Sequence, residues 1–250
     1  MGVTIAERPR RRSLGEFAAQ PEADDAVYRL TDVIRVYREA DVETIALRGV
    51  DLTIQPGEFV AIMGRSGSGK STLLNLLAGS DRPTAGRVQF LGRDLATADD
   101  ATRSAIRGRE IGIVYQSQNL APMLTLVENI RLAAWLAGRP IDESKARFAL
   151  ERVDLGHRAG HRPAQLSGGE QQRAALSCVM AAGPTVLLAD EITGELDSAS
   201  ADVVLQLLRD THLAEGTTVV LVTHDHDVAA RADRIIELRD GRVVPDRRPR

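Results

Sequence analysis

Residues 64–71 read Gly64-Arg65-Ser66-Gly67-Ser68-Gly69-Lys70-Ser71 and fit the pattern G-x-x-x-x-G-K-[ST]. In this pattern, backbone N–H groups surround a di- or triphosphate and the lysine reaches the terminal phosphates. Glycine lets the backbone approach a phosphate because no Cβ lies in the way. A helix is expected to begin near Lys70 and to direct the positive end of its dipole at the anion. The segment therefore predicts a nucleotide-binding loop.

The composition of the 250-residue chain narrows its class only slightly. The length suits one large domain or two tightly joined lobes. The formal net charge is −3, so overall electrostatics gives no reason to expect a nucleic-acid partner. A single cysteine, Cys178, excludes an internal disulfide and favours a reducing cytosolic setting. No apolar run approaches the roughly 18–20 residues that span a bilayer, so any role at a membrane is expected to depend on a partner.

Hydrophobic patterning predicts an α/β fold between two tails. Residues 1–26 and 245–250 are expected to be tails, and the arginines of the first leave open a contact with anionic lipid headgroups. Residues 118–165 have a helical pattern, with Leu126, Ile130, Leu132 and Leu136 roughly on one face. A helix at 198–209 separates two later strands, which predicts a parallel sheet flanked by helices. The expected strands are 28–30, 33–37, 45–47, 50–54, 58–63, 186–189, 219–222 and 234–238.

Two carboxylates, Asp190 and Glu191, directly follow the apolar strand at 186–189. Hydrolysis of a nucleotide needs one carboxylate for the water shell of Mg²⁺ and one to orient or deprotonate the attacking water. Alone, such a pair would be interpreted as an ordinary solvated helix start, but its position after a phosphate-binding loop favours catalysis. Lys70, Ser71 and the metal would supply much of the remaining charge neutralisation.

His224 also follows an apolar strand, in the run Val222-Thr223-His224-Asp225. A histidine at this place can donate a hydrogen bond to a γ-phosphate or to the attacking water. A metal site around His224 and His226 is disfavoured because no third ligand is evident. The other histidines, His157, His161 and His212, are expected at the surface.

Residues 166–171 read Leu166-Ser167-Gly168-Gly169-Glu170-Gln171, a motif that is highly specific to one family. Together with the phosphate-binding loop, it gives the chain a resemblance to the nucleotide-binding subunit of ABC transporters over about residues 28–244. The resemblance implies an ATPase with a P-loop fold: a mostly parallel core sheet and an N-terminal antiparallel β subdomain. The ABC ATPase domain would span 27–244, with a helical subdomain at about 118–165.

The resemblance also implies roles for matching residues. Tyr37 resembles the aromatic residue that stacks on adenine, with Tyr28 as the competing candidate, and Gln116 resembles the glutamine that contacts Mg²⁺ and senses the membrane subunit. The catalytic set would be Glu191, His224, Lys70 and Gln116, and the Mg²⁺ ligands Ser71, Gln116 and Asp190. ATP would be bound by Tyr37, Gly64, Arg65, Ser66, Gly67, Ser68, Gly69, Lys70, Ser71 and Thr72, and from the opposite subunit of a head-to-tail homodimer by Ser167, Gly168, Gly169 and Glu170.

A narrower resemblance lies in residues 58–64 and 116–130, which are similar to the lipoprotein-releasing, macrolide-exporting and FtsX-partnered group. It implies a peripheral protein at the cytoplasmic face of the membrane, driving an FtsX- or MacB-like permease with a large extracytoplasmic domain. Two departures from the family are Ile192, where proline is usual, and Cys178, where arginine is common; we expect Cys178 to be a small buried hydrophobic residue. A soluble ABC ATPase acting on ribosomes or DNA is the alternative, and a catalytically inactive structural relative is a third possibility.

Overall fold

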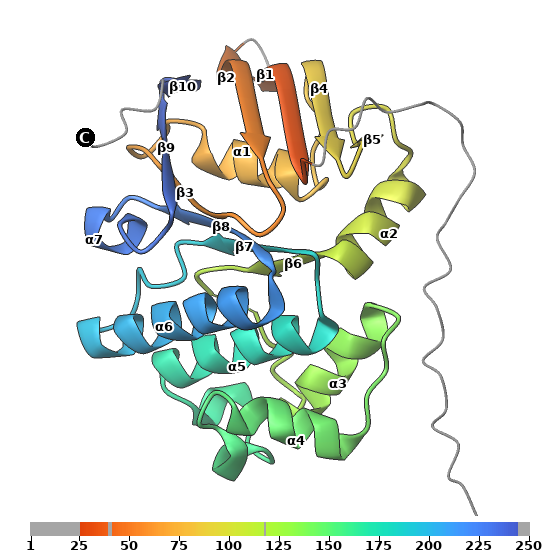
Figure 1. Ribbon diagram of the computed structural model, residues 1–250, viewed down its shortest axis with the longest axis vertical. Coiled ribbons are helices and arrows are strands. Elements are labelled where there is room, and N and C mark those ends of the chain that lie inside the picture. Colours follow the sequence, from red (N-terminus) through yellow and green to blue (C-terminus); the bar gives the residue numbers. More distant parts are fainter. Residues whose placement is uncertain (1–25, 40–41, 118, 245–250) are drawn as a thin grey trace, which may run out of the picture.

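The computed structural model describes residues 26–39, 42–117 and 119–244, and it contains two β-sheets with a helix between them (Figure 1). The smaller sheet is antiparallel, with strand order β2-β1-β4-β5. The larger sheet has the order β10-β9-β3-β8-β7-β6 and is parallel except for the edge strand β10. The strands are β1 (Tyr28–Glu39), β2 (Val42–Ile54), β3 (Phe59–Met63), β4 (Ala85–Phe90), β5 (Arg93–Asp94), β6 (Ile111–Val114), β7 (Val186–Asp190), β8 (Thr218–Thr223), β9 (Arg234–Arg239) and β10 (Arg242–Val244).

The helices lie in layers around the larger sheet (Figure 1). One helix, α1, lies between the two sheets, α5 and α6 cover the opposite face of the larger sheet, and α3 and α4 pack beyond α5. The predicted α/β fold, with a mostly parallel core sheet and a separate antiparallel sheet, is confirmed. The helices are α1 (Lys70–Leu77), α2 (Asp100–Glu110), α3 (Leu126–Leu136), α4 (Glu143–Glu151), α5 (Gly168–Ala182), α6 (Ser198–Glu215) and α7 (His226–Ala229), with 3₁₀ turns at Gly156–Arg158 and Pro163–Gln165.

The side chains of β3 alternate between buried clusters on the two faces of the larger sheet. Val60 and Ile62 of β3 belong to the buried cluster that includes the leucines of α1. Phe59 of the same strand belongs to the cluster formed with α5 and α6, as does Leu221 of β8. Because successive side chains of a strand point to opposite faces, a strand buried on both faces must be apolar throughout. All five residues of β3 are buried, which fixes the strand that leads into the phosphate-binding loop.

Two pairs of expected short strands are single long strands in the structure. The segments 28–30 and 33–37 are both parts of β1, and 45–47 and 50–54 are both parts of β2. The two strands pair along their length with register shifts, which mark β-bulges. Asp32 and Gly49 have positive φ angles of 46° and 75° at these interruptions. The two interruptions are therefore bends within continuous strands and not loops.

The expected apolar face of residues 126–136 is only half correct. Leu126 and Ile130 are buried, but Leu132 is 36% exposed and Leu136 is 62% exposed. An α-helix returns to the same face after three or four residues, so the buried face continues from Ile130 through Ala134 and not through Leu132. The expected tails at 1–26 and 245–250 lie outside the described residues, apart from Ala26.

Candidate active site

Four neighbouring strands of the larger sheet end at one edge. The strands β3, β8, β7 and β6 are parallel neighbours in this order, with Met63 beside Thr223 at the ends of β3 and β8. The phosphate-binding loop follows β3, whereas Gln116, Glu191 and His224 follow β6, β7 and β8. Ligands of open α/β sheets bind outside the carboxyl ends of their strands. The fold therefore gathers segments that are far apart in the sequence at the place where a ligand is expected.

These residues line a single cleft of 1240 Å³. Its opposite side is formed by the antiparallel sheet, through Tyr37 of β1 and residues 44–46 of β2. Tyr28 is fully buried, and its hydroxyl donates a hydrogen bond to the carbonyl oxygen of Leu77, so it does not reach the cleft. The predicted site residues that line the cleft are Tyr37, Gly64, Arg65, Ser66, Gly67, Gly69, Lys70, Ser71, Thr72, Gln116, Asp190, Glu191 and His224.

The phosphate-binding loop is shaped to receive an anion. Gly67 and Gly69 have φ angles of 76° and 104°, which glycine adopts without strain. A Cβ at Gly67 would meet no atom within 4 Å, so the backbone there is open to a ligand. Gly69 is the N-cap of α1 and supplies no side-chain hydrogen bond, which leaves the first N–H groups of α1 without a side-chain partner. These groups and the helix dipole favour a bound phosphate.

Lys70 is buried at 8% exposure beneath this loop. Its Nζ donates hydrogen bonds to the carbonyl oxygens of Gly64 at 2.9 Å and Arg65 at 3.2 Å. An ammonium group has three donors, so one remains for a ligand. Ser68 Oγ is buried in the same loop without a hydrogen-bond partner. The remaining donor of Lys70 fits a phosphate, whereas Ser68, although predicted to bind ATP, does not line the cleft.

Glu191 lies at a sharp turn at the end of β7. Its φ angle is 47°, and its N–H donates a hydrogen bond to the carbonyl oxygen of Val222 at 3.0 Å. The N–H of Gly194 donates to the carbonyl oxygen of Glu191 at 3.0 Å. His224 Nδ1 lies 3.2 Å from Glu191 Oε1. Non-glycine residues in this left-handed conformation concentrate at functional sites, and here the turn directs a carboxylate and an imidazole toward the same cleft.

Asp190 ends β7 in a partly buried position. Burial raises the pKa of its carboxyl group, the neighbouring charge of Glu191 raises it further, and Lys70 partly offsets the rise. Ser71 and Gln116 also line the cleft, and Gln116 Nε2 donates a weak hydrogen bond to Glu195 Oε1 at 3.4 Å. Hydroxyl, amide and carboxylate oxygens are the ligands that Mg²⁺ prefers. The donor types of Ser71, Gln116 and Asp190 therefore fit Mg²⁺ bound together with a phosphate ligand.

The residues of the Leu-Ser-Gly-Gly-Glu-Gln motif lie away from this cleft. Ser167 is the N-cap of α5, and its side chain accepts a hydrogen bond from the N–H of Glu170 in a capping box. Gly168 and Gly169 form the first turn of α5. Gly168 borders a separate pocket of 140 Å³, and none of the four residues lines the large cleft. Within one chain, the motif and the phosphate-binding loop do not form a common site.

Gln172 is a polar residue of this region that the sequence did not single out. It is 5% exposed, and its Nε2 lies 3.0, 3.0 and 3.1 Å from the carbonyl oxygens of Tyr115, Gln116 and Ile192. Its Oε1 accepts a hydrogen bond from Asn119 at 3.0 Å. Gln172 thus joins α5 to the backbone of Gln116 and to the carbonyl group of Ile192, the residue after Glu191. The only signal in the sequence was a polar residue on the buried face of a helix.

Comparison with known proteins places this geometry in a family. The family model described as "ABC transporter" matches residues 47–194, more than half of the chain. The "Macrolide export ATP-binding/permease protein MacB" of Azoarcus sp. (strain BH72) is 44% identical over 242 residues, which are 96% of this chain and 37% of the relative. Its namesake in Rhodospirillum rubrum is 48% identical over 219 residues, 87% of this chain and 34% of the relative. The chain thus spans about a third of the length of these relatives.

Two solved structures of an ATP-binding cassette are also similar to this chain. The "dimeric structure of a post-hydrolysis state of the ATP-binding cassette MJ0796 bound to ADP and Pi" has a TM-score of 0.82 and 40% identity, and the match covers 89% of this chain and 99% of that one. A second dimeric structure of MJ0796 has a TM-score of 0.79 and 41% identity, covering 86% and 96%. In the part of the chain that the structure describes, no helix is long and apolar enough to cross a membrane. The motifs, the converging strand ends and these matches agree: the chain belongs to the ABC transporter family.

Proposed function

We propose that this chain is the ATP-binding cassette of an ABC transporter and that it hydrolyses ATP to drive a membrane permease. The convergence of the phosphate-binding loop, Gln116, Glu191 and His224 at one sheet edge is the observation that carries the proposal. The similar MJ0796 cassette, solved in a post-hydrolysis state with ADP and Pi bound, supports it. The proposed ABC ATPase domain spans 27–244, with a helical subdomain at about 118–165.

In this proposal each cleft residue acts on one part of the nucleotide. Tyr37 stacks on the base, residues 64–72 surround the phosphates, and Lys70 neutralises charge at the terminal phosphate. Glu191 orients the attacking water and accepts its proton, and His224, 3.2 Å from that carboxylate, holds the water or the terminal phosphate by a hydrogen bond. Because phosphoryl transfer depends mainly on positioning and charge neutralisation, these fixed groups supply most of the catalysis.

Mg²⁺ would be held by Ser71, Gln116 and Asp190, directly or through water. When bound, it supplies charge neutralisation between the phosphates. Burial and Glu191 raise the pKa of Asp190. A nearby divalent cation would oppose this rise, because it favours the ionised carboxylate.

The assembly would be a head-to-tail homodimer. Four residues of the motif lie outside the cleft of their own chain and would close the site of a second copy: Ser167, Gly168, Gly169 and Glu170. The dimeric MJ0796 structures support a dimer, and the permease named in the MacB relatives supports a membrane partner. The partner would be an FtsX- or MacB-like permease with a large extracytoplasmic domain, and the cassette would lie at the cytoplasmic face of the membrane without a nucleic-acid partner.

Glu191→Gln tests the chemistry. The variant should bind ATP, lose at least a hundredfold in turnover and accumulate as a closed dimer in size-exclusion chromatography with ATP. Glu143→Gln, at an exposed carboxylate of α4, is the matched control and should hydrolyse ATP at the wild-type rate. Turnover by Glu191→Gln at the rate of the control would refute the assigned role.

The same variant tests the partner. With ATP, Glu191→Gln should capture from native membranes a permease with few spans and a large external domain. Capture of ribosomal or DNA-repair components without an integral membrane protein would overturn the transporter assignment and leave the ATPase chemistry intact.

A further inference from the structure

Tyr37 is held by a charged pair at the edge of the cleft. Its hydroxyl donates a hydrogen bond to Asp81 Oδ2 at 2.8 Å. Arg35 Nε donates to the same oxygen at 2.9 Å, and Arg35 Nη2 lies 2.8 Å from Asp81 Oδ1. The guanidinium carbon of Arg35 lies over the ring of Tyr37, 4.4 Å from its centroid. The hydroxyl and one face of the ring are therefore both occupied within the protein.

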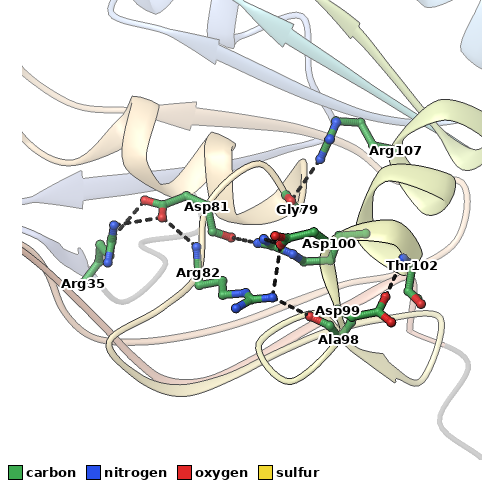
Figure 2. Close-up of polar contacts among 10 residues, drawn as sticks. Arg35, Gly79, Asp81, Arg82, Ala98, Asp99, Asp100, Thr102 and Arg107 are labelled. Carbon is green, nitrogen blue, oxygen red and sulfur yellow. Dashed lines mark hydrogen bonds and ion pairs between the residues drawn. The ribbon is translucent and has the colours of Figure 1, made fainter.

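Asp81 is itself fixed by the segment that follows α1. Figure 2 shows the Arg35 side chain and the backbone N–H of Arg82 directed at the Asp81 carboxylate, while the Arg82 side chain reaches Asp100 of α2 and the carbonyl oxygen of Ala98. The N–H of Arg82 donates to Asp81 Oδ1 at 2.7 Å, and Arg103 donates to the carbonyl oxygen of Asp81 at 3.2 Å. The side chains of Arg35 and Asp81 are 23% and 22% exposed, so solvent screens this pair less than a surface ion pair. The support of Tyr37 thus extends from β1 to α2.

We propose that Arg35 and Asp81 are positioning residues that fix the ring of Tyr37 as the platform for the nucleotide base. The inference rests on the proposed function, because it requires a nucleotide in the cleft. Arg35 and Tyr37 are two residues apart on β1 and so lie on the same face of the strand. Since the guanidinium covers one face of the ring, a base can stack only on the other.

The arrangement favours base binding for two physical reasons. A ring whose plane is already fixed loses less side-chain entropy when a base stacks on it. The guanidinium is attracted to the negative face of the ring, and this cation–π attraction keeps the two groups in a constant relative position. The proposal therefore predicts that the pair contributes to affinity through the base and that phosphate binding by the loop is unchanged without it.

Calorimetric titration with ADP and with inorganic tripolyphosphate separates these two contributions, because only ADP carries a base. Arg35→Leu should weaken ADP binding about five- to tenfold, equivalent to about 1–1.4 kcal/mol, and change tripolyphosphate binding less than about twofold. Tyr37→Phe, which removes only the bond to Asp81, should have a smaller effect in the same direction. Arg38→Leu is the matched control, since Arg38 lies on the same strand and pairs with Glu43 outside the cleft. It should change neither affinity.

A double-mutant cycle isolates the path through the ring. In a Tyr37→Leu background, Arg35→Leu should have no further effect on ADP binding. Equal loss of affinity for both ligands in Arg35→Leu, or no loss for either, would overturn the inference. If Tyr37→Leu binds ADP as tightly as the wild type, the inference fails and phosphate binding by the cleft stands. If the wild type binds neither ligand, the proposed function fails with it.

Discussion

Replacement of Gln172 by methionine tests whether the buried amide joins α5 to the active-site loops. Methionine has nearly the same length and volume, so the change removes hydrogen bonds without creating a cavity. The amide has two N–H donors for three carbonyl oxygens and accepts one bond from Asn119, which makes about three bonds in total. At a net value of about 1 kcal/mol for each bond, the expected loss of folding free energy is about 3 kcal/mol. For a chain of this size the loss corresponds to a fall in Tm of about 6–12 °C.

The neighbouring glutamine is a matched control in the same turn of α5. Gln171 is exposed and donates one hydrogen bond, to the carbonyl oxygen of Leu166 at 3.2 Å. Gln171→Met should therefore lower the free energy of unfolding by at most about 1 kcal/mol. Differential scanning calorimetry of both variants without nucleotide measures the difference. Equal values of Tm for Gln172→Met and Gln171→Met would refute the reasoning.

Other predictions follow from the site. Burial raises the pKa of Asp190 in the folded protein above its unfolded value. The contribution of this carboxyl group to the free energy of unfolding is therefore fully present below the unfolded pKa and is lost as the pH rises through the folded pKa. Asp190→Asn should therefore raise the Tm of the nucleotide-free protein at pH 7 by an amount that shrinks toward pH 4, and a gain independent of pH would contradict this. Gly64→Ala should lower the free energy of unfolding by about 3 kcal/mol, since its Cβ would lie 2.3 Å from the carbonyl oxygen of Leu238. Gly67→Ala, with open space around its Cβ, should cost about 1 kcal/mol from its positive φ alone, and denaturant unfolding compares the two. Burial raises the pKa of the Cys178 thiol to about 12, so iodoacetamide at pH 8 should label it only after unfolding; rapid labelling of the native protein would contradict the burial.

The sequence predicted the centre of the fold better than its edges, for physical reasons. Strands buried on both faces, such as β3 and β8, appear as continuous apolar runs, and polar residues at their carboxyl ends are then conspicuous. Helix ends were harder to predict. The helix expected at 198–209 extends to Glu215, so His212 lies inside α6 and is only 7% exposed, and its expected surface position was wrong. Its Nδ1 lies 2.9 Å from the carbonyl oxygen of Thr217, and its ring packs against Phe59.

Contacts made through side chains of ordinary composition were not predictable. Neither Arg35 nor Asp81 belongs to a motif with a local signature, and their pairing joins segments 46 residues apart. Gln172 contacts two loops that lie 56 and 20 residues away. The spacing of motifs along the chain identifies the side chains that the reaction needs in one site. The residues that orient those groups are chosen by tertiary packing, which only the structure shows.

The proposed head-to-tail dimer accounts for the position of the Leu-Ser-Gly-Gly-Glu-Gln motif outside the cleft of its own chain. The cleft is walled by the phosphate-binding loop, the antiparallel sheet and the ends of the central strands, but the capped start of α5 takes no part in it. The first turn of α5, which contains Gly168 and Gly169, nevertheless lies at the positive end of a helix dipole, as the first turn of α1 does, although Ser167 caps the N–H of Glu170. The start of α5 does not line the cleft of its own chain, so in the proposed assembly it would serve the cleft of another copy. A second copy in head-to-tail orientation would let each α5 face the open side of the other cleft, so ATP would serve both as the substrate and as the contact between the copies.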